Sequence, residues 1–216
     1  MGVYSSVVRF FLEGGFFMYP IMAVLAVGTA VAIERYIYLS IARATNRRLW
    51  DDVVPALRSG KYQQAMTITA GSKSAIATIL SYGLARIKSA RRREDIEMAM
   101  EEGLMEMIPR LEKRTAYLAT FANIATLLGL LGTIIGLIQA FTAVAEAGPA
   151  EKAALLSSSI SVAMNTTAFG LIVAIPLLLI YAVLQSKTTQ LVDSLEMASV
   201  KFLNMVTERA KPESGV

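Results

Sequence analysis

Residues 127–141, LLGLLGTIIGLIQAF, and residues 163–181, AMNTTAFGLIVAIPLLLIY, decide the fold. Neither stretch contains a charged residue, and each carries threonine within its apolar run. Crossing a bilayer takes about 20 mostly apolar residues. Because polar side chains at mid-membrane depth typically mark a pathway, the two stretches predict a pair of membrane helices along which ions or protons move.

A third apolar stretch, roughly residues 16–38, precedes these two, which themselves extend over roughly 117–144 and 160–184. The chain has 216 residues and is 55% hydrophobic, too apolar for an ordinary soluble domain. The sequence therefore predicts an all-α membrane protein with three transmembrane helices. Between the first and second spans, apolar residues recur at amphipathic helical spacing, which predicts that the membrane helices continue into a further helical region.

Basic residues predict the direction of the spans. Between Arg43 and Arg114 there are 14 Lys and Arg against 9 Asp and Glu, whereas the link before the third span holds only Lys152 as a cation. The positive-inside rule places the basic segment in the cytoplasm and the link outside. A multi-pass protein with its N-terminus outside and its C-terminus in the cytoplasm follows.

We expect six segments along the chain. These are an N-terminal segment with transmembrane helix 1 (1–42), a cytoplasmic helical region (43–115), transmembrane helix 2 (116–145), a short external link (146–159), transmembrane helix 3 (160–185), and a cytoplasmic C-terminal helix and tail (186–216). The N-terminus does not read as a cleaved signal peptide, because Arg9 and Glu13 interrupt its apolar run, so it is expected to be retained.

Finer expectations concern where the helices break. The amphipathic stripe over 91–114 predicts one long helix that continues into the second span, kinked at Pro109. A break is expected at Ser59-Gly60, and a separate helix over 188–206. Glu34 and Arg35 end the first span and are expected to anchor it by snorkelling toward the interface.

Composition excludes most enzyme chemistry. The chain has no Cys and no His, which rules out disulfides, thiol nucleophiles and His-based metal or triad sites. No Gly-rich phosphate loop is present. We therefore expect no catalytic residue, no metal site and no cofactor. Nothing resembles a nucleic-acid-binding module, and the membrane topology, with the lipid bilayer as the chain's surroundings, accounts for the excess of basic residues.

Small and polar residues in the two deciding stretches suggest distinct roles. Gly129, Gly132 and Gly136 let helix backbones approach closely, which is a packing role. Thr126 precedes Thr133 by seven residues and shares nearly the same helix face. The alternative for any such threonine is a hydrogen bond to its own helix backbone.

The second stretch brings three polar side chains together. Asn165 either bonds across a helix interface or contacts an ion. Thr166 points about 100° away from Thr167, so one of the two hydroxyls is expected to face a neighbouring helix or subunit.

The run over 127–141, followed after a short link by TTAFGLIVAIPLLLIY, resembles the ExbB/TolQ/MotA family of ion-driven motor and energy-transducing channel subunits. Glu34-Arg35 and the three-span layout are closest to the ExbB/TolQ branch. The resemblance implies a ring-forming homopentamer in a bacterial inner membrane. It implies as partner two copies of a single-span ExbD/TolR-like protein with an aspartate in its span, and admits a TonB/TolA-like protein. Ion flow would then drive mechanical work, for which TonB-type outer-membrane import is the expected process.

The resemblance also assigns residues. Thr133 and Thr167 match the two pore-lining threonines, and Thr166, Asn165 and Thr126 are secondary candidates for the ion pathway. The family pattern is not complete: Val162 stands at a usual glutamate, Ala125-Thr126 at a usual Ala-Pro, and Tyr181-Ala182 at a usual Tyr-Asn. Without that glutamate, the neutral oxygens of Asn165, Thr166 and Thr167 can hold a monovalent cation such as Na⁺, whereas a proton needs a titratable group or a chain of water molecules. Both Na⁺ and H⁺ stay open as the transported ion.

Two other classes of function stay open at this point. A small-solute transporter is disfavoured, because carriers usually contain repeats around a midplane site and no internal repeat is found here. A non-conducting membrane scaffold would explain the helices without any pathway. Replacing Thr133 or Thr167 by valine separates the classes, because only an ion pathway needs the hydroxyl.

Overall fold

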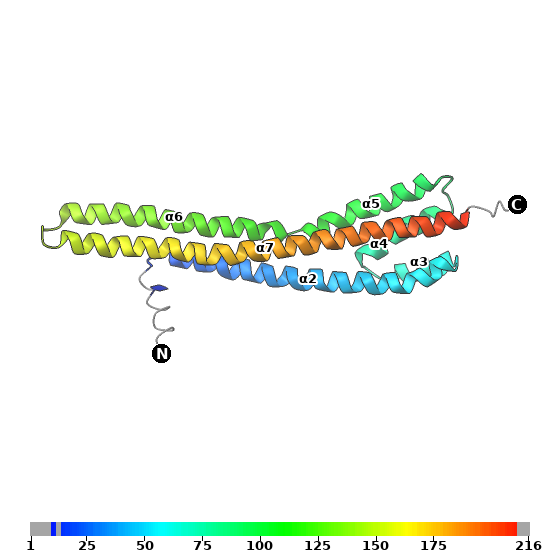
Figure 1. Ribbon diagram of the computed structural model, residues 1–216, viewed down its shortest axis with the longest axis horizontal. Helices are drawn as coiled ribbons and strands as arrows, with labels where there is room; N and C mark the ends of the chain where they lie inside the picture. Colours follow the sequence, from blue (N-terminus) through cyan, green and yellow to red (C-terminus); the bar gives the residue numbers. More distant parts are fainter. Residues whose placement is uncertain (1–9, 12–13, 211–216) are drawn as a thin grey trace, which may run out of the picture. The chain divides into compact units, whose positions relative to one another are not determined.

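The computed structural model describes residues 10–11 and 14–210, and every regular element in this part of the chain is helical. The elements are α2 (Met18–Arg58), α3 (Tyr62–Ala70), α4 (Ala75–Ile87), α5 (Arg93–Glu112), α6 (Thr115–Glu146) and α7 (Lys152–Ala210), as labelled in Figure 1. The predicted all-α class is confirmed. The expectation of a retained N-terminus and that of a tail after the last helix fall largely on 1–9, 12–13 and 211–216, outside the described residues.

Three stretches of helix are long and apolar enough to cross a membrane, as predicted. They lie in α2, in residues 93–146 and in α7. Within 93–146 the apolar part belongs to α6, because α5 carries nine charged side chains whereas α6 carries only Glu146. The described residues thus contain three candidate spans, each provided by one helix.

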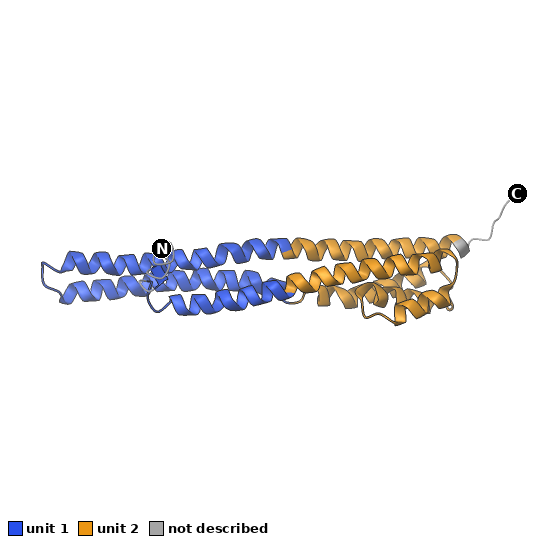
Figure 2. Cartoon of the chain, turned by 90° about the horizontal axis from the view of Figure 1, so that it is seen from below, with its two compact units in different colours: residues 1–34, 114–183 blue, residues 35–113, 184–216 orange. Residues whose placement is uncertain are grey.

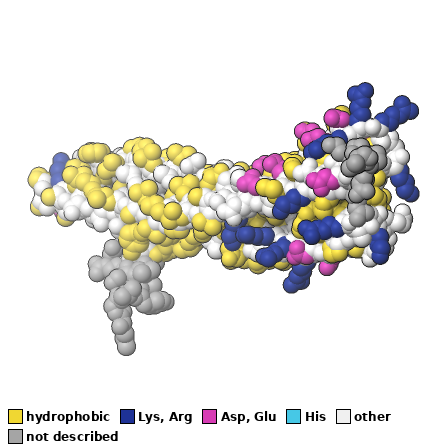
Figure 3. All heavy atoms as spheres, turned by 45° about the vertical axis from the view of Figure 1, so that its right-hand side comes forward, with side chains coloured by type: hydrophobic (Ala, Val, Ile, Leu, Met, Phe, Trp, Pro, Cys, Tyr) yellow, Lys and Arg dark blue, Asp and Glu magenta, His cyan; other side chains and the backbone are white. Residues whose placement is uncertain are grey.

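The chain divides into two compact units, coloured separately in Figure 2. Unit 1 comprises residues 1–34 and 114–183, and unit 2 comprises residues 35–113 and 184–216. In the view of Figure 3, Lys, Arg, Asp and Glu gather over unit 2, whereas the visible face of unit 1 is largely hydrophobic and uncharged. Exposed side chains such as Ile138, Phe141 and Leu179 make that surface suitable for contact with lipid.

Small residues set the packing of unit 1. Gly28 of α2 lies against Leu177 of α7, where an added Cβ would come within 2.9 Å of a Leu177 methyl group. Leu177 itself is buried, as are Ala122 and Ala125 on α6. Dense packing of small against large side chains is how helices associate where water supplies no driving force.

Unit 2 has an ordinary apolar core between helices. Gly83 of α4 faces Met100 of α5 and Phe202 of α7, and an added Cβ would lie 2.8 Å from each. Phe202 is among the largest fully buried side chains. At the start of α4, the Ser74 hydroxyl accepts a hydrogen bond from the Ala77 N–H at 3.3 Å, which is an N-cap.

Two expectations about helix continuity are wrong, and one is confirmed. α5 and α6 are separate, because the chain turns at Lys113 and at Arg114, which adopts φ 68°. Pro109 lies in the last turn of α5 and does not mark the break. α7 is a single helix of 59 residues, with no separate C-terminal helix. The expected break near Ser59-Gly60 is present, since α2 ends at Arg58 and α3 begins at Tyr62.

Candidate functional site: a threonine pair between two apolar helices

The hydroxyls of Thr133 on α6 and Thr167 on α7 contact each other within unit 1. The Thr167 hydroxyl is also 2.9 Å from the carbonyl oxygen of Gly129, and the Thr133 hydroxyl is 3.2 Å from the same oxygen. The carbonyl oxygen of Ala163 lies 3.3 Å from the Thr133 hydroxyl. The two hydroxyls therefore share the Gly129 carbonyl oxygen of α6, and the Ala163 carbonyl oxygen of α7 is a further acceptor for Thr133 alone.

This arrangement leaves the threonine protons a choice of acceptors. Each hydroxyl has one proton to donate and two lone pairs with which to accept. If Thr167 donates to Gly129, Thr133 can donate either to Thr167 or to Ala163. Both side chains are half-buried, so the pair forms a polar spot between two otherwise apolar helices.

The side chain of Thr166 lies in the interior of unit 1. Thr166 is only 2% exposed, and its hydroxyl has two carbonyl oxygens as acceptors for its proton, that of Gly14 at 2.6 Å and that of Val162 at 3.0 Å. Its methyl group fills the space beside Gly132, where an added Cβ would lie 2.4 Å away. Of the two adjacent threonines, Thr166 is thus the one that faces neighbouring segments.

The other secondary candidates do not join the pair. Thr126 is exposed and donates back to the Ala122 carbonyl oxygen of its own helix at 3.1 Å. Asn165 is half-buried, and its side chain makes no hydrogen bond within the described part of the chain. Neither side chain is hydrogen-bonded to Thr133 or Thr167.

The glycines of α6 lie where α7 comes closest. A Cβ added at Gly129 would be 3.3 Å from backbone atoms of Thr166, Thr167 and Gly170. At Gly136 it would be 3.0 Å from the Ala163 Cβ. Glycine permits this approach without any displacement of α7, and the approach brings the Gly129 carbonyl oxygen to the Thr167 hydroxyl.

Arg35, at the end of the first span, does not snorkel as expected. Arg35 is 3% exposed and lies in unit 2, where its guanidinium donates to the Leu111 carbonyl oxygen and stacks 4.8 Å from the Tyr38 ring. Glu34 belongs to unit 1 and pairs with Arg114 at 3.4 Å. Backbone carbonyls left without partners at the end of α5 explain why the guanidinium is buried there.

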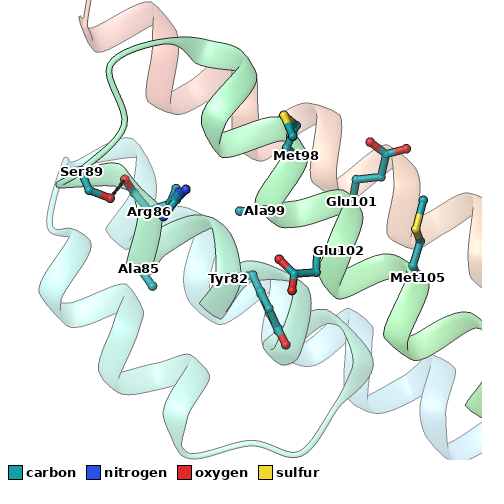
Figure 4. Close-up of a pocket in the computed structure, with 9 residues that line it drawn as sticks. All are labelled: Tyr82, Ala85, Arg86, Ser89, Met98, Ala99, Glu101, Glu102 and Met105. Carbon is teal, nitrogen blue, oxygen red and sulfur yellow. Dashed lines mark hydrogen bonds between the residues drawn. The ribbon is translucent and has the colours of Figure 1, made fainter.

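A cavity of about 670 Å³ lies between α4 and α5 in unit 2 (Figure 4). Met98 and Met105 border it together with Glu102 and Tyr82. The Tyr82 hydroxyl donates to the Glu106 carboxylate at 3.1 Å, and this bond raises the pKa of Tyr82. No group of three potential metal ligands occurs among the described residues, and none of the predicted pathway residues borders this cavity.

One further group of polar residues was not predicted from the sequence as a site. Arg43, Asn46 and Arg47 line a second cavity of unit 2, with Lys201 from α7. Their spacing of three and four residues along α2 is a visible sign of a shared helix face. What it cannot reveal is that Asn46 is buried and that α7 supplies a third cation.

Known proteins resemble this chain over most of its length. The sequence profile of the MotA/TolQ/ExbB proton channel family matches residues 71–197. A putative biopolymer transport protein ExbB homolog of Methanothermobacter thermautotrophicus is 28% identical over 195 residues, which are 90% of this chain and 68% of the relative. A putative biopolymer transport protein ExbB-like 1 of Synechocystis is 31% identical, over 85% of this chain and 72% of the relative. The biopolymer transport protein ExbB of Salmonella typhimurium is 30% identical over 62% of this chain and 59% of its own length.

The family match covers α6 and most of α7, including Thr133, Thr167 and the glycines of α6. The family is described as one of proton channels, which agrees with three long apolar helices and a polar pair between two of them. The chain therefore belongs to the MotA/TolQ/ExbB proton channel family.

Proposed function

We propose that this chain is the ring-forming channel subunit of an inner-membrane motor driven by ion flow, of the TonB/Tol type. The hydroxyl pair of Thr133 and Thr167 carries the proposal, because it is a polar contact between the two apolar helices of a proton channel family member. Five copies would surround two copies of a single-span ExbD/TolR-like partner, and a TonB/TolA-like protein would receive the work. Outer-membrane import is the process we propose.

The chemistry of the pair explains what the subunit would contribute. Residues 117–144 and 160–184 contain no Asp, Glu, Lys or Arg, so they offer no carboxylate to store a proton. A hydroxyl can accept a proton on one side and release one on the other, and thereby relays without storing. The titrating group must then come from outside these stretches, and the membrane aspartate of the partner would supply it.

We propose the proton as the transported ion, in keeping with the family description. Sodium is the alternative, because Val162 replaces a usual glutamate and the neutral oxygens of Asn165 and Thr167 are suited to a monovalent cation. The two ions are separated by activity in sodium-free medium. Full activity without sodium, abolished by a proton uncoupler, would refute the sodium alternative.

Orientation follows from charge. The cations of unit 2, among them Arg47 and Arg48 of α2, would face the cytoplasm, with the N-terminus outside. The short link between α6 and α7 would then lie on the outer side, in the periplasm. Accessibility labelling of single cysteines in that link and in α5 tests this topology directly, because the natural chain has no Cys.

Valine substitutions of the two threonines test the pathway. Valine keeps the shape of threonine and removes the hydroxyl, so Thr133→Val and Thr167→Val should each lower uptake through an outer-membrane receptor by about tenfold or more in a complemented deletion strain. Thr142→Val is the matched control, because its exposed hydroxyl bonds only to the Ile138 carbonyl oxygen of its own helix. Its uptake should equal that of the wild type.

The assembly must be measured beside the activity. Native mass spectrometry of the complex from its own membranes should give five copies with two of a smaller single-span protein, for the wild type and for each variant. Inactive variants with an intact complex support a pathway. If both threonine variants remain fully active, the subunit acts as a scaffold, and a chain that stays alone in mild detergents contradicts the motor altogether.

A further inference from the structure

A cavity of about 300 Å³ in unit 2 combines positive charge with a buried, unpaired donor. It lies between α2, the start of α4 and α7. Its polar lining consists of Arg43, Asn46, Arg47, Ser194 and Lys201, and Ile76 marks the first turn of α4. Volumes of 300 Å³ and above are typical of small-molecule sites.

Helix periodicity brings the cations together. Arg43 and Arg47 are four residues apart on α2, with Asn46 between them on the same face. Lys201 approaches from α7, seven residues after Ser194. No Asp or Glu lines the cavity, and none of the three cations has a carboxylate within 4 Å among the described residues.

The side-chain amide of Asn46 lacks one hydrogen-bond acceptor. Its side chain is 5% exposed, and its Oδ1 accepts a hydrogen bond from the Ile76 N–H at 3.2 Å. That bond fixes the amide orientation, because only the oxygen can accept. The Nδ2 group is then left buried without an acceptor anywhere in the described part of the chain. Buried donors are almost always paired in native proteins, so an unfilled one calls for an acceptor that the chain does not supply.

The start of α4 adds to the same potential. α4 has 13 residues, and its first turn borders the cavity at Ile76. The N-terminus of a helix carries a partial positive charge, which stabilises an anion placed beside it. Three cations, a helix N-terminus and an unpaired amide donor therefore meet at one cavity with no internal anion.

We propose that this cavity binds a phosphate group. Phosphate oxygens are acceptors on every side, so they suit the Asn46 amide and the planar donors of Arg43 and Arg47 at once. A volume of about 300 Å³ corresponds to roughly ten water molecules, which admits inorganic phosphate or a small phosphate ester. This proposal does not rest on the ion pathway, since none of the pathway residues lines the cavity.

The phosphate can come from solution or from a lipid headgroup. Asn46 lies five residues beyond the exposed Ile41 on α2, which is about 7.5 Å along the helix at 1.5 Å per residue. The polar headgroup layer of a bilayer adds about 5–8 Å beyond the hydrocarbon. Both sources therefore come within reach, and the experiment must separate them.

The test is titration calorimetry of the full chain with inorganic phosphate, in nanodiscs of phosphatidylcholine. We expect saturable binding at one site per chain. Arg47→Gln and Lys201→Gln should each weaken it about tenfold, the cost of one charge-assisted hydrogen bond. Arg48→Gln is the matched control: it removes the next exposed cation on α2, which does not line the cavity, and should change the affinity by less than about twofold.

A second variant addresses the buried donor. Asn46→Asp keeps an acceptor for the Ile76 N–H, replaces the unpaired donor and adds a negative charge, so it should abolish phosphate binding while circular dichroism stays unchanged. Absence of saturable binding by the wild type would overturn the proposal. So would equal losses in Arg47→Gln and Arg48→Gln, because they would show only a general effect of surface charge.

Nanodiscs that contain phosphatidylglycerol identify the source. If the headgroup fills the cavity, the added lipid should compete and weaken inorganic phosphate binding about tenfold, and Arg47→Gln should remove this competition. If the natural ligand is a soluble phosphate, the affinity should be the same in both membranes. Either result supports a phosphate site, and each names a different ligand for it.

Discussion

The closest backbone approach in unit 1 makes a sharp prediction for Gly170→Ala. An added Cβ at Gly170 would lie 2.7 Å from the Ala125 carbonyl oxygen and 3.1 Å from the Gly129 Cα. Both are backbone atoms of α6, so no side chain can rotate away. Ordinary contact begins at 3.4 Å, which means that α7 must move away from α6 by about 0.7 Å (3.4 − 2.7).

That displacement has an energetic consequence. It would lengthen the Thr167 hydroxyl to Gly129 carbonyl distance from 2.9 Å to about 3.6 Å, beyond a hydrogen bond. Overpacking costs about 1–3 kcal/mol, and a lost interhelical hydrogen bond about 0.6 kcal/mol more. Alanine regains about 1 kcal/mol of helix propensity over glycine. The net loss in the free energy of unfolding should therefore be about 0.6–2.6 kcal/mol.

Thermal unfolding of the purified chain, followed by circular dichroism in one detergent, measures this loss. For a chain of this size about 1 kcal/mol corresponds to 2–4 °C, so the melting temperature of Gly170→Ala should fall by about 1–10 °C. Gly148→Ala is the control, because nothing lies within 4 Å of its added Cβ. If the two variants melt together, the close approach of α6 and α7 is not a determinant of stability and the reasoning fails.

Three further predictions concern the charged residues. Arg35→Leu removes a buried guanidinium from the Leu111 carbonyl oxygen and should lower the free energy of unfolding by about 1.5–3 kcal/mol. Arg114→Gln breaks only an exposed ion pair with Glu34 and should lower it by about 1 kcal/mol or less. Equal losses in denaturant titrations would contradict the importance of burial. Arg114→Gly should be more stable than Arg114→Gln by about 1 kcal/mol in the same titrations. Both variants lack the ion pair, but glycine adopts φ 68° without strain. Equal stability of the two variants would exclude backbone strain at residue 114. Two backbone N–H groups at the start of α5 donate to the Asp95 carboxylate and hold its pKa below its usual value. The stabilising effect of Asp95 is therefore present above pH about 4 and is lost as the pH falls through the lowered pKa. The melting temperature of the wild type should fall over that pH range, and a fall of the same size in Asp95→Asn would refute this assignment.

The three candidate membrane helices can be predicted from the sequence because hydropathy and length are local properties. The break between α5 and α6 is different. Lys113 and Arg114 are ordinary helix formers, and nothing in their identities announces a left-handed backbone at Arg114. Its position depends on tertiary contacts, among them the Glu34 carboxylate that meets Arg114.

The continuity of α7 was missed for a related reason. The apolar run stops near Leu184, which suggested a boundary there. Leu184, Leu191, Leu195 and Phe202 are nevertheless all buried, at spacings of seven, four and seven residues that keep one helix face toward the core of unit 2. A change of environment along a helix alters the pattern from uniformly apolar to amphipathic, and it does not end the helix.

For the candidate site, spacing showed only that Thr166 and Thr167 point in different directions. Which of them turns inward depends on partners far away in the sequence: the Gly14 carbonyl oxygen, 152 residues away, and the gap beside Gly132. The contact between Thr133 and Thr167 likewise joins residues 34 positions apart, and no local pattern encodes it. Tertiary geometry decided both points.

The glycines and the threonines, considered separately in the sequence, form one structural unit. Gly170 and Gly129 bring α6 and α7 close enough for the Thr167 hydroxyl to reach a carbonyl oxygen that belongs to the other helix. Gly170→Ala should therefore disturb the threonine pair as well as the packing, and its effect on stability should not add to that of Thr167→Val. Since both changes remove the same hydrogen bond, the double variant should be more stable than the sum of the single losses predicts, by about 0.5 kcal/mol or more. Strict additivity would show that packing and the hydroxyl pair are independent, and the shared unit would have to be given up.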